Sequence, residues 1–185
     1  MAYCNTLVGI PKDCGDNNSG SAKRVFIGSF EDVISLTVTA TADPDTDGEV
    51  TAATREVGTK FEEFTFPKDT SSFAQDLVVD LVADTHGYSQ TLEMGFRRID
   101  LRKRNAISLL IEGRRDLIAV VEDTNGDYWM LGADQGLRVT ANSATSNATR
   151  AAGQALPVTL TSEYEKHQWY KVDATVAAGL LVAAV

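Results

Sequence analysis

The residues with the clearest metal-binding spacing are the carboxylates of Asp43-Pro-Asp45-Thr-Asp47-Gly48. Alternating acids followed by glycine are typical of the first half of an EF-hand calcium loop, in which carboxylates chelate the ion and glycine allows the sharp turn. The bidentate acid that closes such a loop is missing, because Thr54 stands at its position. The segment therefore indicates an acidic surface turn, with a calcium-dependent binding or adhesion module as the alternative.

Other residues that could carry chemistry do not form a recognisable set. His86 and His167 are the two histidines, and neither has an evident metal or nucleophile partner in the sequence. Phosphate-binding loops, paired catalytic acids and nucleophile elbows are missing too, so we expect no enzyme, no catalytic residue, no cofactor and no metal. Cys4 and Cys14 are too few for a disulfide scaffold or a zinc site, and we expect free thiols.

Charge is unevenly distributed along the chain. The net charge of −9 argues against a general nucleic-acid binder, because such proteins need a basic face. A basic cluster nevertheless surrounds one predicted helix: Arg97, Arg98, Arg102, Lys103, Arg104, Arg114 and Arg115. A nucleic-acid footprint is one interpretation. The charge balance favours contact with a neighbouring copy, whose acidic partners would be Asp43, Asp45, Asp47, Glu49 and Glu56.

The helix at the centre of this cluster is predicted over residues 100–112. Asp100 is a credible N-cap, and a helical stripe of Ala106, Ile107, Leu110 and Ile111 is expected to face the core. Two β-rich runs follow, 117–121 and 128–131. Asn125-Gly126 between them predicts a hairpin with a type I′ turn.

A second hairpin is predicted over residues 71–99. Alternation places Phe73, Leu77, Val79 and Leu81 on one apolar face, which Leu92, Met94 and Phe96 continue on the returning strand. The opposite face is mainly acidic. Its carboxylates include Asp76, Asp80 and Glu93, with Arg97 near the strand end.

The rest of the chain completes a mainly β protein. The length of 185 residues suits a single domain over 1–185. Further strands are expected over 23–30, 33–41, 61–66, 137–141, 157–164 and 167–176. Residues 1–23 are expected to be an extended arm without a signal peptide, 42–59 a long loop and 142–155 a mobile loop. The apolar C-terminus is too short for a membrane span and indicates a last strand or buried tail. About ten strands with one helix predict a β-barrel or sandwich with a flanking helix.

The order of several motifs resembles the tail tube proteins of phages that infect Bacteroidetes hosts, crAss-like phages included. The motifs are DCGDNNSG, KRVFIG, FTFPKDTSSF, DLRKRNAISLLIEGR and VVEDTNGDYWMLGADQGLRVT. The resemblance spans roughly residues 10–170, and the KRN helix and the hairpin after it are its most specific parts. It implies a tail-tube-like β-barrel or sandwich, six copies in a ring, and rings stacked into a virion tube that conducts DNA. Such a protein would assemble in the host bacterial cytoplasm.

The resemblance implies a role for each of two surfaces. Asp76, Asp80 and Glu93 are expected to face the lumen, because a bore that repels phosphate lets DNA slide without sequence-specific binding. The helix, with Arg102, Lys103, Arg104, Arg114 and Arg115, is expected near the seam between subunits. The partners would be further copies and other tail proteins at the tube ends, with no membrane insertion. A tail adaptor or terminator ring and a capsid decoration protein are the other virion roles considered.

Overall fold

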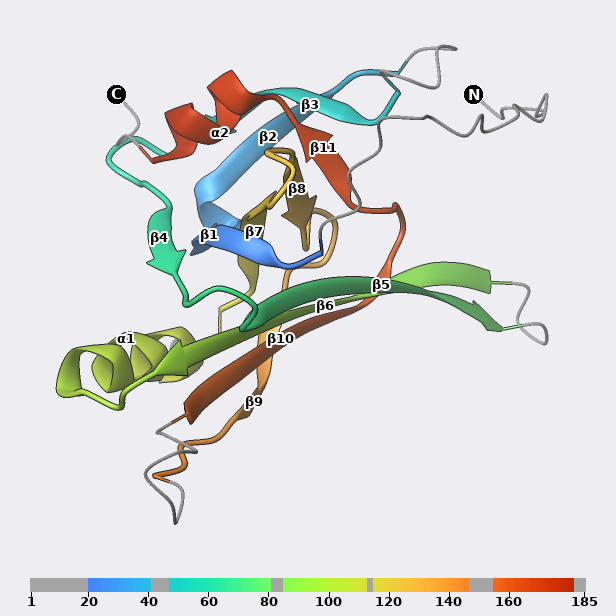
Figure 1. The fold of residues 1–185 in the computed structure, drawn as a ribbon. Helices are drawn as coiled ribbons and strands as arrows, with labels where there is room; N and C mark the ends of the chain where they lie inside the picture. The colour runs from blue at the N-terminus through green and yellow to red at the C-terminus, as the bar shows by residue number, and fades with distance from the viewer. Residues whose placement is uncertain (1–19, 41–46, 81–84, 113–114, 147–154, 182–185) are drawn as a thin grey trace.

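The computed structural model describes residues 20–40, 47–80, 85–112, 115–146 and 155–181. These residues form strands, two α-helices and one short 3-10 helix (Figure 1). The elements are β1 Ala22–Ser29, η1 Phe30–Asp32, β2 Val33–Val38, β3 Glu49–Arg55, β4 Glu62–Thr65, β5 Ser71–Asp80, β6 Thr85–Arg97, α1 Leu101–Glu112, β7 Leu117–Asp123, β8 Tyr128–Leu131, β9 Arg138–Asn142, β10 Ala155–Glu165, β11 Tyr170–Val172 and α2 Ala174–Leu180.

The strands form two sheets that pack as a sandwich. The larger sheet has seven strands in the order β2-β3-β11-β8-β7-β1-β4, and the smaller has four in the order β5-β6-β10-β9. The smaller sheet lies across one face of the larger one, with α1 at one end of it (Figure 1). The expected mainly β fold with a flanking helix is therefore confirmed as a two-sheet structure, and the described strands do not close into a barrel.

Strand β7 is the centre of the molecule because every one of its residues is buried. The side chains of Leu117, Ala119 and Val121 join the core between the two sheets. Ile118 and Val120 point the other way, into a second core on the outer side of the large sheet. A continuous apolar run is what a strand buried on both faces requires.

Different elements pack over the two cores. In the first core, side chains of the small sheet fill the space opposite β1 and β7, among them Leu92, Met94, Val158 and Leu160, and each is almost fully buried. In the second core, α2 packs over the large sheet with Ala177 and Leu180. The large sheet thus has apolar residues on both of its faces, whereas the small sheet has them mainly on one.

The expected loop over 42–59 is wrong in part, because β3 occupies residues 49–55 of it. Val50 is the one fully buried apolar residue of this strand, so its hydrophobic pattern is weak. The strand is defined by its neighbours: it pairs with β2 antiparallel and, through Glu49 and Val50, with β11 in parallel. Such long-range pairing gives little local sequence signal.

The expectation of a final strand at 167–176 is also wrong in part, and the apolar C-terminus, expected as a last strand or a buried tail, begins as a helix with Ala177 and Leu180 buried. Strand β11 covers only residues 170–172, and residues 174–180 form helix α2. The Asp173 side chain accepts a hydrogen bond from the Thr175 backbone N–H at 2.7 Å, which caps the helix. At the other end the Arg55 guanidinium donates to the carbonyl oxygens of Gly179 and Leu180, at 3.0 and 3.1 Å.

The β7–β8 hairpin forms where it was predicted, with a different turn. Gly126 has a φ of 95°, but Asn125 does not adopt a positive φ, so the type I′ prediction is wrong. Gly126 N donates to Asp123 O at 3.3 Å and Asp123 N donates to Asp127 O at 2.9 Å. This pattern is that of a type I turn followed by one left-handed glycine. The Asp123 carboxylate favours it by accepting the backbone N–H of Asn125 at 2.7 Å.

Helix α1 begins and ends close to the predicted bounds, and Asp100 caps it by accepting the Lys103 backbone N–H at 2.8 Å. The predicted core stripe is only partly correct. Ile107 is buried and Leu110 packs against the core, but Ile111 is 40% exposed. Since α1 lies at the end of the small sheet and not over its face (Figure 1), only a narrow side of the helix contacts the body.

Candidate functional site

The three predicted lumen residues share one face of the small sheet. On β5 and β6 the residue pairs Ser72–Glu93, Asp76–Ser89 and Asp80–Thr85 alternate with the pairs that point into the core. Asp76, Asp80 and Glu93 are all exposed on the outer face. Most of their neighbours on this face are small or hydroxylated: Ser72, Ala74, Ser89, Thr91, Thr159 and Thr161. Val78 lies on the same face between Asp76 and Asp80, and Arg97 lies near its end.

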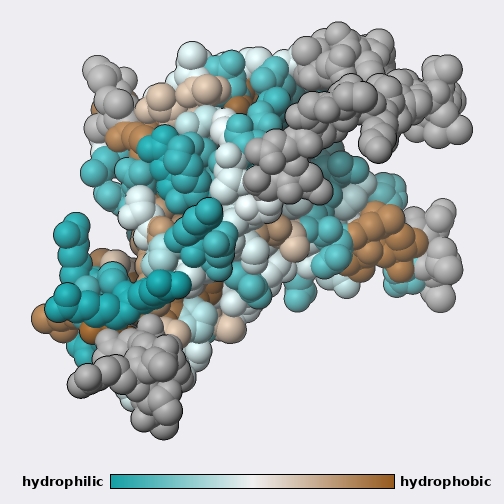
Figure 2. All heavy atoms as spheres, in the orientation of Figure 1, coloured by the Kyte–Doolittle hydropathy of each residue, from teal (hydrophilic) through white to brown (hydrophobic). Residues whose placement is uncertain are grey.

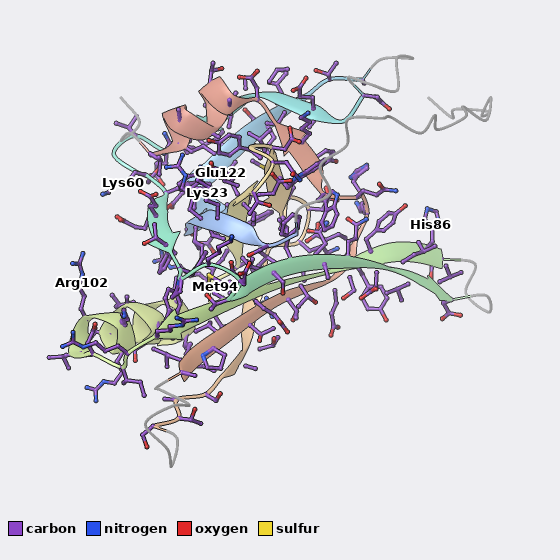
Figure 3. All side chains as sticks on the ribbon, viewed as in Figure 1. Lys23, Lys60, His86, Met94, Arg102 and Glu122 are labelled. Carbon is purple, nitrogen blue, oxygen red and sulfur yellow. The ribbon has the colours of Figure 1, made fainter. Side chains whose placement is uncertain are left out.

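The opposite face of this hairpin is less buried than its alternation predicts. Phe73 packs against the core, but Leu77 and Val79 are 60% and 50% exposed. The reason is the length of β5 and β6, whose paired ends extend past the body of the sandwich (Figure 1). Figure 2 shows an apolar patch over this projecting end. His86, expected in a turn, is exposed on β6 at the same end (Figure 3).

Helix α1 presents a mixed basic and apolar surface. Arg102 and Arg104 are exposed, as are Leu101 and Leu109, at 66% and 73%. Lys103 differs from its neighbours because its ammonium donates to the backbone carbonyls of Arg97 and Arg98, at 2.6 and 3.1 Å. Lys103 therefore stabilises the start of its own helix. The sequence had indicated only a contact with a neighbouring subunit for this residue.

A groove of about 800 Å³ runs between α1 and the edge strand β4. Phe64, Phe96 and Ile107 form part of its apolar lining, and Lys60 and Arg102 are among its charged residues. Figure 3 shows Lys60 and Arg102 at the same end of the molecule. The groove joins an open strand edge to the basic helix.

The other predicted contact residues are divided between described and undescribed segments. Asp43, Asp45 and Arg114 lie outside the described residues, as do Cys4 and Cys14, so the expectations for them stay predictions. Arg115 is exposed. Asp47 and Glu49 lie away from α1, at the mouth of a second cleft.

This second cleft, which sequence reasoning missed, has a volume of about 560 Å³ and lies between the start of β3, the start of β6 and the connection from β10 to β11. Its aromatic lining consists of Tyr88, Trp129, His167, Trp169 and Tyr170. Its charged lining consists of Asp47, Glu49, Lys166 and Lys171. The adjacent aromatic pairs Tyr128-Trp129 and Trp169-Tyr170 were the available sequence signal, but strand residues of this kind are also ordinary core residues.

Buried polar groups hold the wall of this cleft in place. Glu165 is 1% exposed, and its carboxylate accepts the backbone N–H groups of Asp134 and Gln135, at 2.8 and 3.2 Å. Burial raises the pKa of Glu165, although the hydrogen bond from Ser162 acts in the opposite direction. Burial likewise raises the pKa of Tyr170 to about 12.

A histidine–carboxylate pair lies beside the cleft. His167 Nδ1 lies 2.9 Å from Asp134 Oδ2, on the surface of the molecule. Among the residues that the structure describes, no group of three or more His, Cys, Asp or Glu side chains is placed to hold a metal ion. Within the same residues, neither helix is long and apolar enough to cross a membrane.

No protein-family model fits the sequence, and neither the curated proteins nor the solved structures give a significant match. The surfaces described above and the order of the sequence motifs are therefore the observations that bear on function.

Proposed function

We propose that this chain is a virion structural protein, a subunit of hexameric rings that stack into the tube of a phage tail. The observation that carries the proposal is the outer face of the small sheet. It combines exposed carboxylates, Asp76, Asp80 and Glu93, with mostly short side chains, and the cation Arg97 lies near the strand end. A wall of this chemistry repels phosphate and leaves the bore open to a sliding duplex.

The sheet edges support self-assembly. In the described part of the chain, β5 and β9 each have a strand partner on one side only. An open edge exposes backbone N–H and C=O groups, which an adjoining copy can pair. The exposed apolar side chains Leu77 and Val79 lie on one of these edge strands. Such residues are a liability in a monomer and useful in a subunit that is covered on assembly.

Helix α1 is the proposed seam between copies. Arg102, Arg104, Leu101 and Leu109 combine charge with exposed apolar area on one helix. Isolated surface ion pairs contribute only about 0–1 kcal/mol each. Repeated around a closed ring and partly desolvated, the same charges set the register between subunits and reject wrong contacts. The number six and the stacking of rings come from the resemblance to tail tube proteins.

Charge reversal on α1 tests the seam. Arg102→Glu with Arg104→Glu should prevent assembly and leave a folded monomer, as measured by negative-stain electron microscopy, sizing and circular dichroism. Lys68→Glu with Lys166→Glu changes the charge by the same amount at exposed positions outside α1 and outside its groove and should still assemble. Normal tubes from the α1 variant at moderate salt would contradict the seam. A map of the ring with Asp76, Asp80 and Glu93 on its outer surface would contradict the lumen assignment.

A further inference from the structure

The aromatic cleft between the start of β3, the start of β6 and the β10–β11 connection has no assigned ligand, although Asp47 and Glu49 of its lining are among the acidic residues expected to contact a neighbouring copy. We propose that it is a binding site for a neutral saccharide built of hexopyranose units. The inference does not depend on the proposed tube, because it concerns a cleft of the single chain. Its volume of about 560 Å³ is within the range of small-molecule sites.

The aromatic side chains of the cleft are held by other rings. Trp169 packs edge-on against Phe73 with the ring centroids 5.0 Å apart, and Trp129 lies 6.0 Å from Trp169. His167 and Tyr170 form another ring pair, at 5.7 Å. Ring pairs of this kind restrict side-chain rotation. A ligand that stacks here consequently has little side-chain entropy to remove.

The backbone of the β10–β11 connection is fixed as firmly as its rings. The Gln75 side-chain oxygen accepts the backbone N–H of Trp169 at 2.7 Å, and the Gln90 side-chain amide donates to the backbone carbonyl of His167 at 3.4 Å. Asp134 accepts the backbone N–H groups of Lys166 and His167, both at 3.1 Å. An exposed connection held by three polar side chains from other elements is pre-organised in the way that binding sites require.

The charges of the cleft select the class of ligand. An anion such as a nucleotide would meet the carboxylates of Asp47 and Glu49, and a cation would meet Lys166 and Lys171. A wholly apolar ligand would remove water from these charged groups without giving them hydrogen bonds, even though Lys171 keeps its ion pair with Asp127 at 3.0 Å. A sugar meets these demands because its hydroxyl groups bond to ions of either sign, while the C–H groups of its ring face pack on aromatic side chains.

The chain supplies its own reporter for this site. Its two tryptophans, Trp129 and Trp169, both line the cleft, so tryptophan emission, excited selectively over that of tyrosine, reports on changes at the cleft. The experiment titrates dilute full-length protein with cellohexaose, maltohexaose and mannohexaose and follows tryptophan emission. At least one oligosaccharide should produce a saturable change with half-saturation at millimolar concentration or below.

Variants distinguish binding in the cleft from binding elsewhere. Gln168→Ala and Tyr88→Ala remove two residues of the lining, whose side chains contact each other at 3.4 Å. Each should weaken the interaction up to about tenfold, as expected for one lost stacking contact or hydrogen bond. Asn105→Ala removes an exposed amide from α1 and should leave the titration unchanged. Circular dichroism identifies any variant that fails to fold. If one cleft variant fails to fold, the other cleft variant shows whether the saccharide binds in the cleft.

Two results would overturn the proposal. One is the absence of any emission change with all three oligosaccharides, or a change that both cleft variants retain at full strength. The other is emission that shifts with protein concentration and with no saccharide, which would make the cleft a contact between copies. Ring formation is scored separately by electron microscopy, so failure of the saccharide site and failure of the tube are distinguishable.

Discussion

Asp134 holds His167 twice, through the side chain and through the backbone. Its Oδ2 atom lies 2.9 Å from His167 Nδ1 and accepts the His167 backbone N–H at 3.1 Å. Asp134 stands in the turn between β8 and β9, whereas His167 stands between β10 in the small sheet and β11 in the large one. The pair therefore attaches the β8–β9 turn to the connection that passes from the small sheet to the large one.

Removing this attachment should destabilise the fold measurably. Asp134→Ala leaves the backbone N–H groups of Lys166 and His167 without their acceptor, and we expect a loss of about 1–3 kcal/mol in the free energy of unfolding. Urea denaturation followed by circular dichroism measures it. Lys60→Ala, which removes an exposed ion pair with Glu62, is the control and should change stability by less than about 1 kcal/mol. Equal effects of the two variants would contradict the role of Asp134.

The Glu122 carboxylate should make the fold sensitive to acid. Burial alone would raise the pKa of Glu122, but hydrogen bonds from Lys23 and Arg24 outweigh it and hold the pKa below the ordinary value of 4.5. Figure 3 shows Lys23 and Glu122 together at the centre of the molecule. A depressed native pKa contributes stability above the pKa of the unfolded chain, and that stability is lost as the pH falls through the native pKa.

The measurement is the free energy of unfolding at pH 3, 4, 5 and 7. Glu122→Gln should be less stable than wild type at pH 7, and its stability should decline less between pH 5 and pH 3. Glu63→Gln removes the exposed carboxylate that pairs with Arg24 at 3.4 Å and should retain the wild-type slope. A Glu122→Gln slope as steep as that of the wild type would show that other carboxylates govern the acid response.

Glu165 should change the pH dependence of stability in the direction opposite to that of Glu122. Because burial raises its native pKa, the stability linked to it is complete below the unfolded pKa and declines as the pH rises through the native value. Glu165→Gln keeps the shape and an acceptor oxygen without the charge, so its stability relative to wild type should improve between pH 4 and pH 8. Urea denaturation at both pH values tests the sign. Glu165→Ala should be destabilised by about 2–4 kcal/mol, since it leaves buried donors unpaired.

Two glycines should respond to alanine with opposite signs. A Cβ atom at Gly95 would lie 2.4 Å from the carbonyl oxygen of Thr70, so Gly95→Ala must displace backbone. A Cβ atom at Gly179, in helix α2, would meet no atom within 4 Å. We expect Gly95→Ala to lower the melting temperature and Gly179→Ala to raise stability by about 0.5–1 kcal/mol. Thermal unfolding of both variants is the measurement, and a shift in the same direction for both would contradict the packing described at Gly95.

The parts of the fold that the sequence predicts are those with local signals. Helix α1 has its cap at Asp100, and the β7–β8 hairpin has an apolar run on each side of Asn125-Gly126. Strand β3 has no such signal, because its partners β2 and β11 define it. Helix α2 was not predicted, because its apolar, alanine-rich sequence is compatible with a strand or a helix.

The candidate site divides in the same way. Alternation along β5 and β6 correctly groups Asp76, Asp80 and Glu93 on one face. It also groups Leu77 and Val79 with Phe73 on the apolar face, but it does not reveal that the body of the sandwich ends before it covers them. The aromatic cleft was beyond prediction, since it brings together Asp47, Tyr88, Trp129 and Trp169 from distant segments. Only the tertiary fold places these residues side by side.

The parallel pairing of β11 with β3 determines when the large sheet can be completed during synthesis. Lys171 pairs with Glu49 and with Trp129, so β11 is the only described strand between β3 and β8. Until residues 170–172 have left the ribosome, β3 and β8 have no partner on those sides, and the large sheet remains in two pieces. Contacts this distant in sequence make folding slow and leave strand edges open to other chains. A nascent chain stalled before Tyr170 should consequently aggregate more readily than one released after Leu180.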